Sequence, residues 1–187
     1  GSESKDLPGF VVMTSVGGRN PQPTASRQWG AGFLPSRLQG VEFNSAGDPV
    51  HYVGNPAGTS RDAQGRLVKA ITALDRHRNR IINDPETATR IAAYEMAFRM
   101  QASVPELMDV SKEPKHILEM YGAKPGDGSY ASNCLLARRL AERGVRFIHL
   151  YHRGWDHHGG LVKYMNTCCG LTDKPTWALI QDLKQRD

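Results

Sequence analysis

Hydrophobic and polar residues follow three different patterns along this chain, and each predicts a different kind of structure. Residues 7–15 (LPGFVVMTS) hold a continuous apolar run directly after a proline, which is typical of a short buried strand. Residues 16–58 are then broken by many glycines and prolines, which leave room only for short extended pieces at 40–43 and 50–53. We therefore expect one strand and then a long, loop-rich region.

Residues 60–122 show helical periodicity instead. Ser60 is a predicted N-cap for a first helix, which Asn83 ends. Asp84 and Pro85 form the cap and first position of a second helix that extends to residue 102. One side of the first helix, at a spacing of three or four residues, carries Leu67, Ile71, Leu74, Arg78 and Ile81.

Two shorter helices complete this helical block. Ser103 and Pro105 repeat the signal of a cap followed by a proline, and residues 112–121 form another helix that Gly122 ends. Met96 and Met100 in the second helix could be imagined as ligands of a bound group. Because methionine at helical spacing is far more often core, we interpret them as core residues.

The last third changes from helix to strand and back. Residues 129–143 form an amphipathic helix, Gly144 supplies its left-handed stop, and residues 145–151 are an apolar strand. A helix followed at once by a strand is half of a parallel α/β unit, so we expect an α/β fold. A last helix is predicted over 172–186, with Pro175 near its start. Leu179, Ile180 and Leu183 are expected to point inward.

Length and composition favour a single domain or part of one. The chain has 187 residues, and 39% hydrophobic and 23% charged residues place it among soluble globular proteins. Residues 1–6 are interpreted as an expression scar and linker, ahead of the loop-rich region (7–58), the helical block (60–122) and an α/β part (128–187). No apolar run approaches the roughly 18 residues of a transmembrane segment.

The basic charge does not point to nucleic acid. The net charge is +5, but the arginines cluster only at helical spacing, around Arg78 and around Arg139, and we interpret them as solvated helix faces. We expect no nucleic-acid partner, because the sequence shows no continuous basic face with aromatic platforms. The three cysteines, Cys134, Cys168 and Cys169, cannot all pair. Without a spaced Cys-x-x-Cys, they are interpreted as structural or free thiols rather than metal ligands.

The strongest candidate site follows the predicted strand in GVRFIHLYHRGWDHHGG (residues 144–160), which holds four of the seven histidines. Ligands of parallel α/β sheets bind at the carboxyl ends of the strands. Asp156 and His158 are two residues apart there and could reach one ion. A carboxylate and an imidazole suit zinc best, with calcium, magnesium or manganese as alternatives. Two ligands do not complete a site, so the others would come from elsewhere in the fold.

Plainer roles compete for the same residues. The segment could be a polar surface loop, with Trp155 packed as a lid on the core. His149 lies on the strand and is interpreted as an inward, satisfied histidine. Arg153 could contact an anionic substrate, with His157 beside it, although a salt bridge at the rim is the plainer role for Arg153.

Several motifs resemble one protein family. GWDHHG (154–159), LLARRL (135–140), GVRF (144–147), YEMAFRMQ (94–101), SVPEL (103–107) and HILEMYG (116–122) occur in the same order in the sulfatase-like bacterial family catalogued as domain of unknown function 1501. The resemblance covers about residues 7–186. It implies an alkaline phosphatase-like α/β fold with metal ions at the strand ends, acting on phosphate or sulfate esters. By this resemblance Asp156 and His158 would be metal ligands, while His157 occupies a variable position.

The chain also departs from that family. Family members are longer and typically exported to the periplasm. An amino-terminal part carries the first acidic metal motif and any nucleophile, and later motifs read GEFGR and GRDHH. None of these occurs here, and the pair Cys168 and Cys169 replaces one expected cysteine.

These features lead to two competing hypotheses. The first is an internal fragment of a metal-dependent hydrolase of anionic esters, inactive alone. The second is a non-catalytic module that binds a protein or glycan through its loop-rich first third. In either case, exposed apolar faces would favour self-association.

Overall fold

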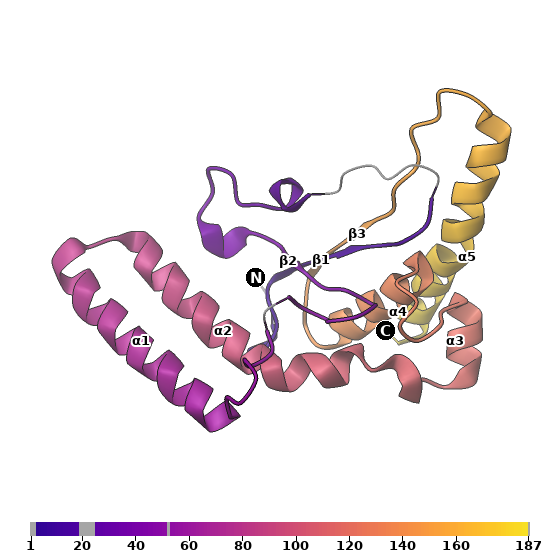
Figure 1. The fold of residues 1–187 in the computed structure, drawn as a ribbon. Helices are drawn as coiled ribbons and strands as arrows, with labels where there is room; N and C mark the ends of the chain where they lie inside the picture. Colours follow the sequence, from indigo (N-terminus) through magenta and orange to yellow (C-terminus); the bar gives the residue numbers. More distant parts are fainter. Residues whose placement is uncertain (1–2, 19–24, 52, 187) are drawn as a thin grey trace.

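A computed structural model describes residues 3–18, 25–51 and 53–186 of the chain (Figure 1). Three parts of the sequence predictions lie outside these residues. They are the interpretation of Gly1 and Ser2 as a scar, the part of the predicted loop region at 19–24, and one position of the extended piece at 50–53. Short 3₁₀ helices occur at Ser26–Gln28, Ser36–Leu38 and Val110–Lys112. The other elements, in chain order, are β1 (Phe10–Thr14), β2 (Val41–Glu42), α1 (Arg61–Ile82), α2 (Pro85–Met108), α3 (Lys115–Tyr121), α4 (Tyr130–Glu142), β3 (Phe147–Tyr151) and α5 (Leu161–Arg186).

The three strands form one parallel sheet in the order β2-β1-β3. Phe10 pairs with Phe147 and Thr14 with Tyr151, so β1 and β3 end level with each other. The predicted α/β class with a parallel sheet is therefore confirmed. The extended piece at 40–43 is present as β2, whereas Val50, His51 and Val53 lie in a turn and its flank rather than in a strand.

The two faces of the sheet have different neighbours. Val11 and Met13 of β1 point into the main core, which α4 covers, and Ile148 and Leu150 of β3 pack against the same core. The opposite face carries Phe10, Phe147, His149 and Tyr151, with the Phe10 and Phe147 rings 4.6 Å apart. The prediction of an inward His149 is wrong, because strand alternation places it with Tyr151 on the partly exposed face.

Helix α4 is the central element of the core and agrees with its prediction. Ser129 caps it by accepting a hydrogen bond from Ser132 N at 3.1 Å, and Gly144 follows with φ +84°. Leu135, Leu136 and Leu140 are almost fully buried. Full burial of a leucine side chain contributes about 1.5–3 kcal/mol, so this helix is a major source of stability.

Arg138 of α4 is buried within an ionic network, against the expectation of a solvated helix face. Its guanidinium lies 2.7 Å from Glu113, 2.9 Å from Glu142 and 3.2 Å from Asp182 of α5, and Glu113 also binds Arg139. Burial alone would lower the pKa of Arg138, but hydrogen bonds to Glu113 and Glu142 raise it. The expectation failed because spacing along one helix does not reveal carboxylates supplied by other elements.

Helix α2 runs further than predicted. It continues through Pro105 to Met108, where the sequence favoured a break and a separate short helix. Ser103, expected to cap that helix, instead donates its hydroxyl proton to the Asp6 carbonyl at 3.2 Å. Val104 and Leu107 on either side of the proline are fully buried. Their packing offsets the hydrogen bond that a proline removes from a helix.

Helix α5 also starts earlier than predicted, at Leu161 rather than 172, and contains Pro175 in its interior. Its buried face includes Cys168, Ala178 and Asp182, while Ile180 and Leu183 are exposed and only Leu179 packs partly against the core. The inward prediction for Ile180 and Leu183 is therefore wrong. Helix α3 begins at Lys115, three residues later than predicted, after a 3₁₀ turn.

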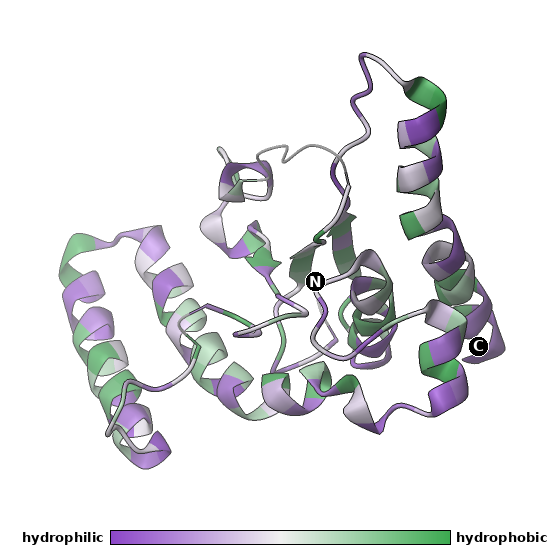
Figure 2. Cartoon of the chain, turned by 45° about the vertical axis from the view of Figure 1, so that its right-hand side comes forward, coloured by the Kyte–Doolittle hydropathy of each residue, from purple (hydrophilic) through white to green (hydrophobic). Residues whose placement is uncertain are grey.

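The α1–α2 hairpin extends from the rest of the molecule at the left of Figure 1. The predicted caps are confirmed: Ser60 Oγ accepts from Ala63 N, and Asp84 Oδ1 accepts from Glu86 N at 2.9 Å. The apolar positions of α1 nevertheless lie on the surface, since Leu67, Leu74 and Ile81 are 51%, 70% and 79% exposed. Figure 2 shows hydrophobic segments on this outer helix. Over the described residues, no helix is long and apolar enough to cross a bilayer.

Candidate metal centre

The candidate site lies at the carboxyl edge of the sheet, where β1 and β3 end side by side. Ser15 N donates to the Tyr151 carbonyl at 3.0 Å and extends the pairing of the two strands by one residue. Residues 152–160 then connect β3 to α5, as the arching segment at the upper right of Figure 1 shows. The predicted histidine loop therefore occupies the edge where parallel α/β folds bind ligands.

The first part of this loop is held firmly. Arg153 Nε donates to the Gly17 carbonyl at 3.2 Å, and Cys168 Sγ of α5 donates to the Gly154 carbonyl at 3.3 Å. A Cβ atom at Gly18 would lie 2.3 Å from the Arg153 carbonyl oxygen, and Gly18 has φ +79°. Only glycine fits there, because both the conformation and the close approach exclude a side chain.

Asp156 and His158 occupy the second, exposed part of the loop. Nε2 of His158 lies 3.0 Å from each carboxylate oxygen of Asp156, and the two side chains are 60% and 86% exposed. Their ligand atoms thus converge on one point beyond the sheet edge. The two side chains hydrogen-bond to each other.

The pair fits part of a metal site. A carboxylate oxygen and an imidazole nitrogen are both zinc ligands, and a tetrahedral zinc ion takes three or four ligands from the protein. Within residues 3–18, 25–51 and 53–186, no three His, Cys, Asp or Glu side chains gather closely enough to hold a metal ion. Asp156 and His158 can therefore supply two positions, and the described residues do not supply a third.

The cysteines do not complete the site. All three are free thiols, as predicted. Cys134 is buried in the core, where burial raises its pKa to about 12, and the Cys168 thiol donates to Gly154. A thiol must lose its proton to bind a metal ion. Cys134 would remain protonated at neutral pH, and Cys169 is partly buried on α5.

The remaining predicted residues are close to this pair in the chain but take other roles. Arg153 forms no ion pair within the described chain, so the plain expectation of a rim salt bridge is not met. The His157 ring stacks on Tyr164 at 6.0 Å, and its ring nitrogens have no hydrogen-bond partner among the described residues. Trp155 meets the His152 ring edge-on at 6.3 Å and is partly exposed, so it is not a lid on the core.

Sequence reasoning missed a second polar pair at the same edge. Ser15 Oγ lies 2.7 Å from His152 Nδ1, and both residues directly follow strand ends, Ser15 after β1 and His152 after β3. Burial lowers the pKa of His152 below 6.5, and the charge of Arg153 lowers it further. The position of Ser15 immediately after a buried apolar run was the available signal. Only the pairing of β1 with β3 reveals its partner.

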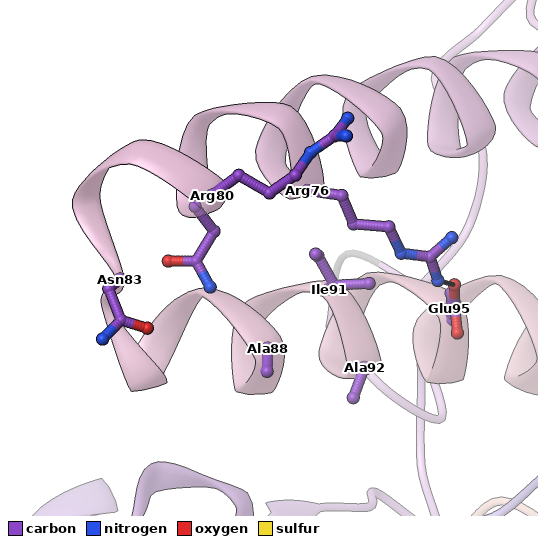
Figure 3. Close-up of a pocket in the computed structure, with 8 residues that line it drawn as sticks. Arg76, Arg80, Asn83, Ala88, Ile91, Ala92 and Glu95 are labelled. Carbon is purple, nitrogen blue, oxygen red and sulfur yellow. Dashed lines mark hydrogen bonds and ion pairs between the residues drawn. The ribbon is translucent and has the colours of Figure 1, made fainter.

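A separate groove of about 590 Å³ lies between α1 and α2 (Figure 3). Arg76 and Arg80 extend from α1 along this groove, Arg76 pairs with Glu95 at 3.5 Å, and Ala88 and Ala92 leave its α2 side shallow. None of the predicted site residues lines it. Because Arg76 is already paired and largely exposed, the groove offers weaker chemistry than the sheet edge.

Comparisons with known proteins identify a family but no activity. A family model described as "Protein of unknown function (DUF1501)" matches residues 1–187. No curated protein and no solved structure matches the chain.

Proposed function

We propose that this chain, which belongs to the DUF1501 family of proteins of unknown function over residues 1–187, is part of a metal-dependent hydrolase of phosphate or sulfate esters. In this proposal Asp156 and His158 provide two ligands of a divalent ion, with zinc as the first choice. The remaining ligands come from polypeptide outside the described residues. The alkaline phosphatase-like relationship belongs to the same proposal, and its support is the resemblance of the motifs.

One observation carries the proposal: a carboxylate and an imidazole converge at the carboxyl edge of a parallel sheet. This edge is the usual place for ligands in α/β folds, and the two groups are the donors that zinc prefers. Contacts with Gly17, Gly18 and Cys168 hold the first part of this loop, so they fix where the segment that carries the exposed pair begins.

A divalent ion bound here would polarise an ester oxygen and stabilise an attacking nucleophile. The chain's own contribution is to orient the two ligands, with Arg153 three residues before Asp156 on the same loop. The Arg153 guanidinium forms no ion pair within the described chain, and its Nε alone is bonded, to Gly17 O. It could therefore pair with an anionic ester through its terminal nitrogens.

Zinc titration calorimetry tests this proposal. The purified chain is compared with Asp156→Asn and His158→Ala variants, and with His51→Ala as a matched control on a turn outside the candidate site. We expect the parent and the control each to bind about one zinc ion measurably. Each loop variant should bind zinc at least about tenfold more weakly, which is the smallest loss of affinity typical of changing a residue in a metal site. Equal affinity in all four proteins would contradict the assignment of the ligands.

A second candidate function is a non-catalytic module that binds a partner or itself. The specific observation is the exposed line of Leu67, Leu74 and Ile81, spaced by seven residues along α1. A helix that leaves such residues in water favours association. Sedimentation velocity of the parent and of a Leu67→Ser/Leu74→Ser/Ile81→Ser variant tests the self-association of this module. A parent that stays monomeric at high concentration would contradict self-association.

A further inference from the structure

The outer side of α1 carries a regular line of exposed residues. Leu67, Leu74 and Ile81 are each more than half exposed, and Ala70 and His77 between them are exposed as well. These five residues, which we call the α1 seam, have the alternating spacing of three and four residues that defines the a and d positions of a heptad repeat. At a rise of about 1.5 Å per residue, the seam is about 21 Å long.

The other side of α1 is the one that packs against α2. Thr72 is buried there, and Asp75 pairs with Arg90 of α2 at 3.1 Å. Because successive residues of a helix are turned by about 100°, Thr72 and Asp75 lie roughly opposite the α1 seam. The seam therefore faces away from α2, on a hairpin that itself extends from the rest of the molecule (Figure 1). A further helix has room to lie along it.

The narrow width of the seam favours a helix as its occupant. A stripe restricted to a and d positions is typical of packing between two helices. A helix that lies in a membrane surface instead buries a broad apolar face rich in Trp, Phe or Leu. Helix α1 contains no Phe, Tyr or Trp, and the d positions of the seam hold one small and one polar residue, Ala70 and His77.

The charged residues beside the seam are all basic. They are Arg66 and Arg80 at g positions and Arg78 at an e position, and none of them forms an ion pair within the part of the chain that the structure describes. Helix α1 has six basic and two acidic side chains, so it accounts for +4 of the net charge of +5. One of the two acids, Asp75, already pairs with α2. Residues at e and g select the partner of a helix by charge, so these arginines favour carboxylates.

A second copy of α1 cannot supply those carboxylates, because the helix has no Asp or Glu at an e or g position. We propose that the α1 seam binds an acidic amphipathic helix of another polypeptide, with aliphatic residues at its a and d positions and Glu or Asp at e and g. Its aliphatic side chains pack against Leu67, Leu74 and Ile81, and its carboxylates pair with the flanking arginines. The inference rests on the partner-binding role given above as the second candidate function and names the chemistry of that partner.

Fluorescence anisotropy with designed peptides tests the proposal on the whole chain. The probe is a labelled peptide of about three heptads, with Leu at a and d and Glu at e and g. A second peptide has Lys in place of each Glu, and a third keeps the composition of the first but breaks the heptad spacing of its leucines. We expect the Glu peptide to bind at least about tenfold more tightly than either of the other two.

Reversing the charges beside the seam should reverse this preference. In an Arg66→Glu/Arg78→Glu/Arg80→Glu variant, the Lys peptide should bind more tightly than the Glu peptide. The matched control changes the net charge equally at exposed lysines outside α1 and should keep the preference of the parent; it is Lys112→Glu/Lys124→Glu/Lys184→Glu. Circular dichroism verifies that both variants retain their helices.

The apolar part of the seam is tested by the Leu67→Ser/Leu74→Ser/Ile81→Ser variant, which should lose binding of the Glu peptide although all its arginines remain. The proposal is overturned if the Glu and Lys peptides bind equally, or if charge reversal leaves the preference unchanged. It is also overturned if the parent dimerises through these three residues, which makes the occupant a second copy. Binding to vesicles of phosphatidylglycerol without binding to the Glu peptide overturns it in favour of a membrane surface. None of these measurements involves zinc, so failure of the hydrolase proposal is distinguishable from failure of this one.

Discussion

Helices α1 and α4 have similar apolar spacing but opposite environments. Leu135 and Leu140 of α4 are fully buried against the sheet and α5, whereas Leu74 and Ile81 of α1 are 70% and 79% exposed. Both helices were predicted from periodicity and caps, and both are present. The difference teaches that periodicity predicts a helix but not what covers its apolar side, since that depends on elements far away in sequence.

The arginines of the two helices show the same contrast. Arg76 of α1 pairs with Glu95 of α2 at 3.5 Å while remaining largely exposed. Arg138 of α4 has a side chain only 4% exposed and lies among three carboxylates from α4, α5 and the turn before α3. An exposed pair contributes little to stability, but removing one partner from a buried network leaves charges unpaired.

The largest expected effect follows from that contrast. Arg138→Ala should lower the free energy of unfolding by up to about 3–5 kcal/mol, because Glu113 and Asp182 would each lose the buried cation that they share and keep only Arg139 and Arg186 as partners. Arg76→Ala is the matched control and should change it by less than about 1 kcal/mol. Urea unfolding followed by circular dichroism measures both. Similar losses in the two variants would show that the hairpin is as tightly coupled to the fold as α4.

Leucine-to-alanine substitutions in α4 and α1 compare how much apolar packing each helix contributes to stability. Leu135→Ala removes a fully buried side chain and should cost about 2–5 kcal/mol. Leu74→Ala removes a largely exposed one and should stay within about 0.5 kcal/mol. The midpoints of urea unfolding give both values. A large loss for Leu74→Ala in the isolated chain would mean that a partner, such as a second copy, covers α1 in solution.

Substitutions at two glycines, Gly18 and Gly47, compare the anchored segment beside Arg153 with a loop that has free space around it. Gly18 and Gly47 both have positive φ, but only at Gly18 would a Cβ meet backbone, 2.3 Å from the Arg153 oxygen. Gly47→Ala should cost about 1–2 kcal/mol from its left-handed conformation. Gly18→Ala should cost more than that and should also weaken zinc binding, because it displaces Arg153 and the loop that follows. Zinc affinities that are equal in the two variants would contradict the anchoring of the pair by this loop.

The smallest expected effect concerns pH. The folded pKa of His152 is lower than its unfolded value near 6.5, so folding favours the neutral ring. Stability from this group is present above pH 6.5 and is lost as the pH falls through the folded pKa. Unfolding curves between pH 7.5 and about 5 should therefore show a weaker pH dependence for His152→Gln than for the parent. A pH dependence of stability in His152→Gln that equals that of the parent would contradict this contribution of His152.

The sequence was sufficient wherever local chemistry decides the structure. The caps at Ser60, Asp84 and Ser129 and the stop at Gly144 all occur as predicted, and the apolar runs became parallel strands. It failed at Pro105 and Pro175, where burial of neighbouring side chains keeps a helix continuous against the local preference of proline. A local signal cannot measure that tertiary contribution.

The candidate site was predictable in the same limited way. Asp156 and His158 stood out because they follow a strand and share a short glycine-rich loop, and the structure brings their ligand atoms to 3.0 Å. The pair of Ser15 and His152 was not predictable, because their contact spans 137 positions and exists only through the pairing of β1 with β3. The inward role assigned to His149 failed because one residue of strand alternation reverses the face.

X-ray absorption spectroscopy at the zinc edge tests the central claim most directly. The spectrum of the chain loaded with no more than one equivalent of zinc gives the type and distance of the atoms bound to the ion. We predict one imidazole nitrogen and one carboxylate oxygen at about 2.0–2.2 Å, with water in the other positions. The nitrogen contribution should disappear in His158→Ala. A zinc shell that contains sulfur, or that is unchanged in His158→Ala, would contradict the assignment of the metal centre to the loop after β3.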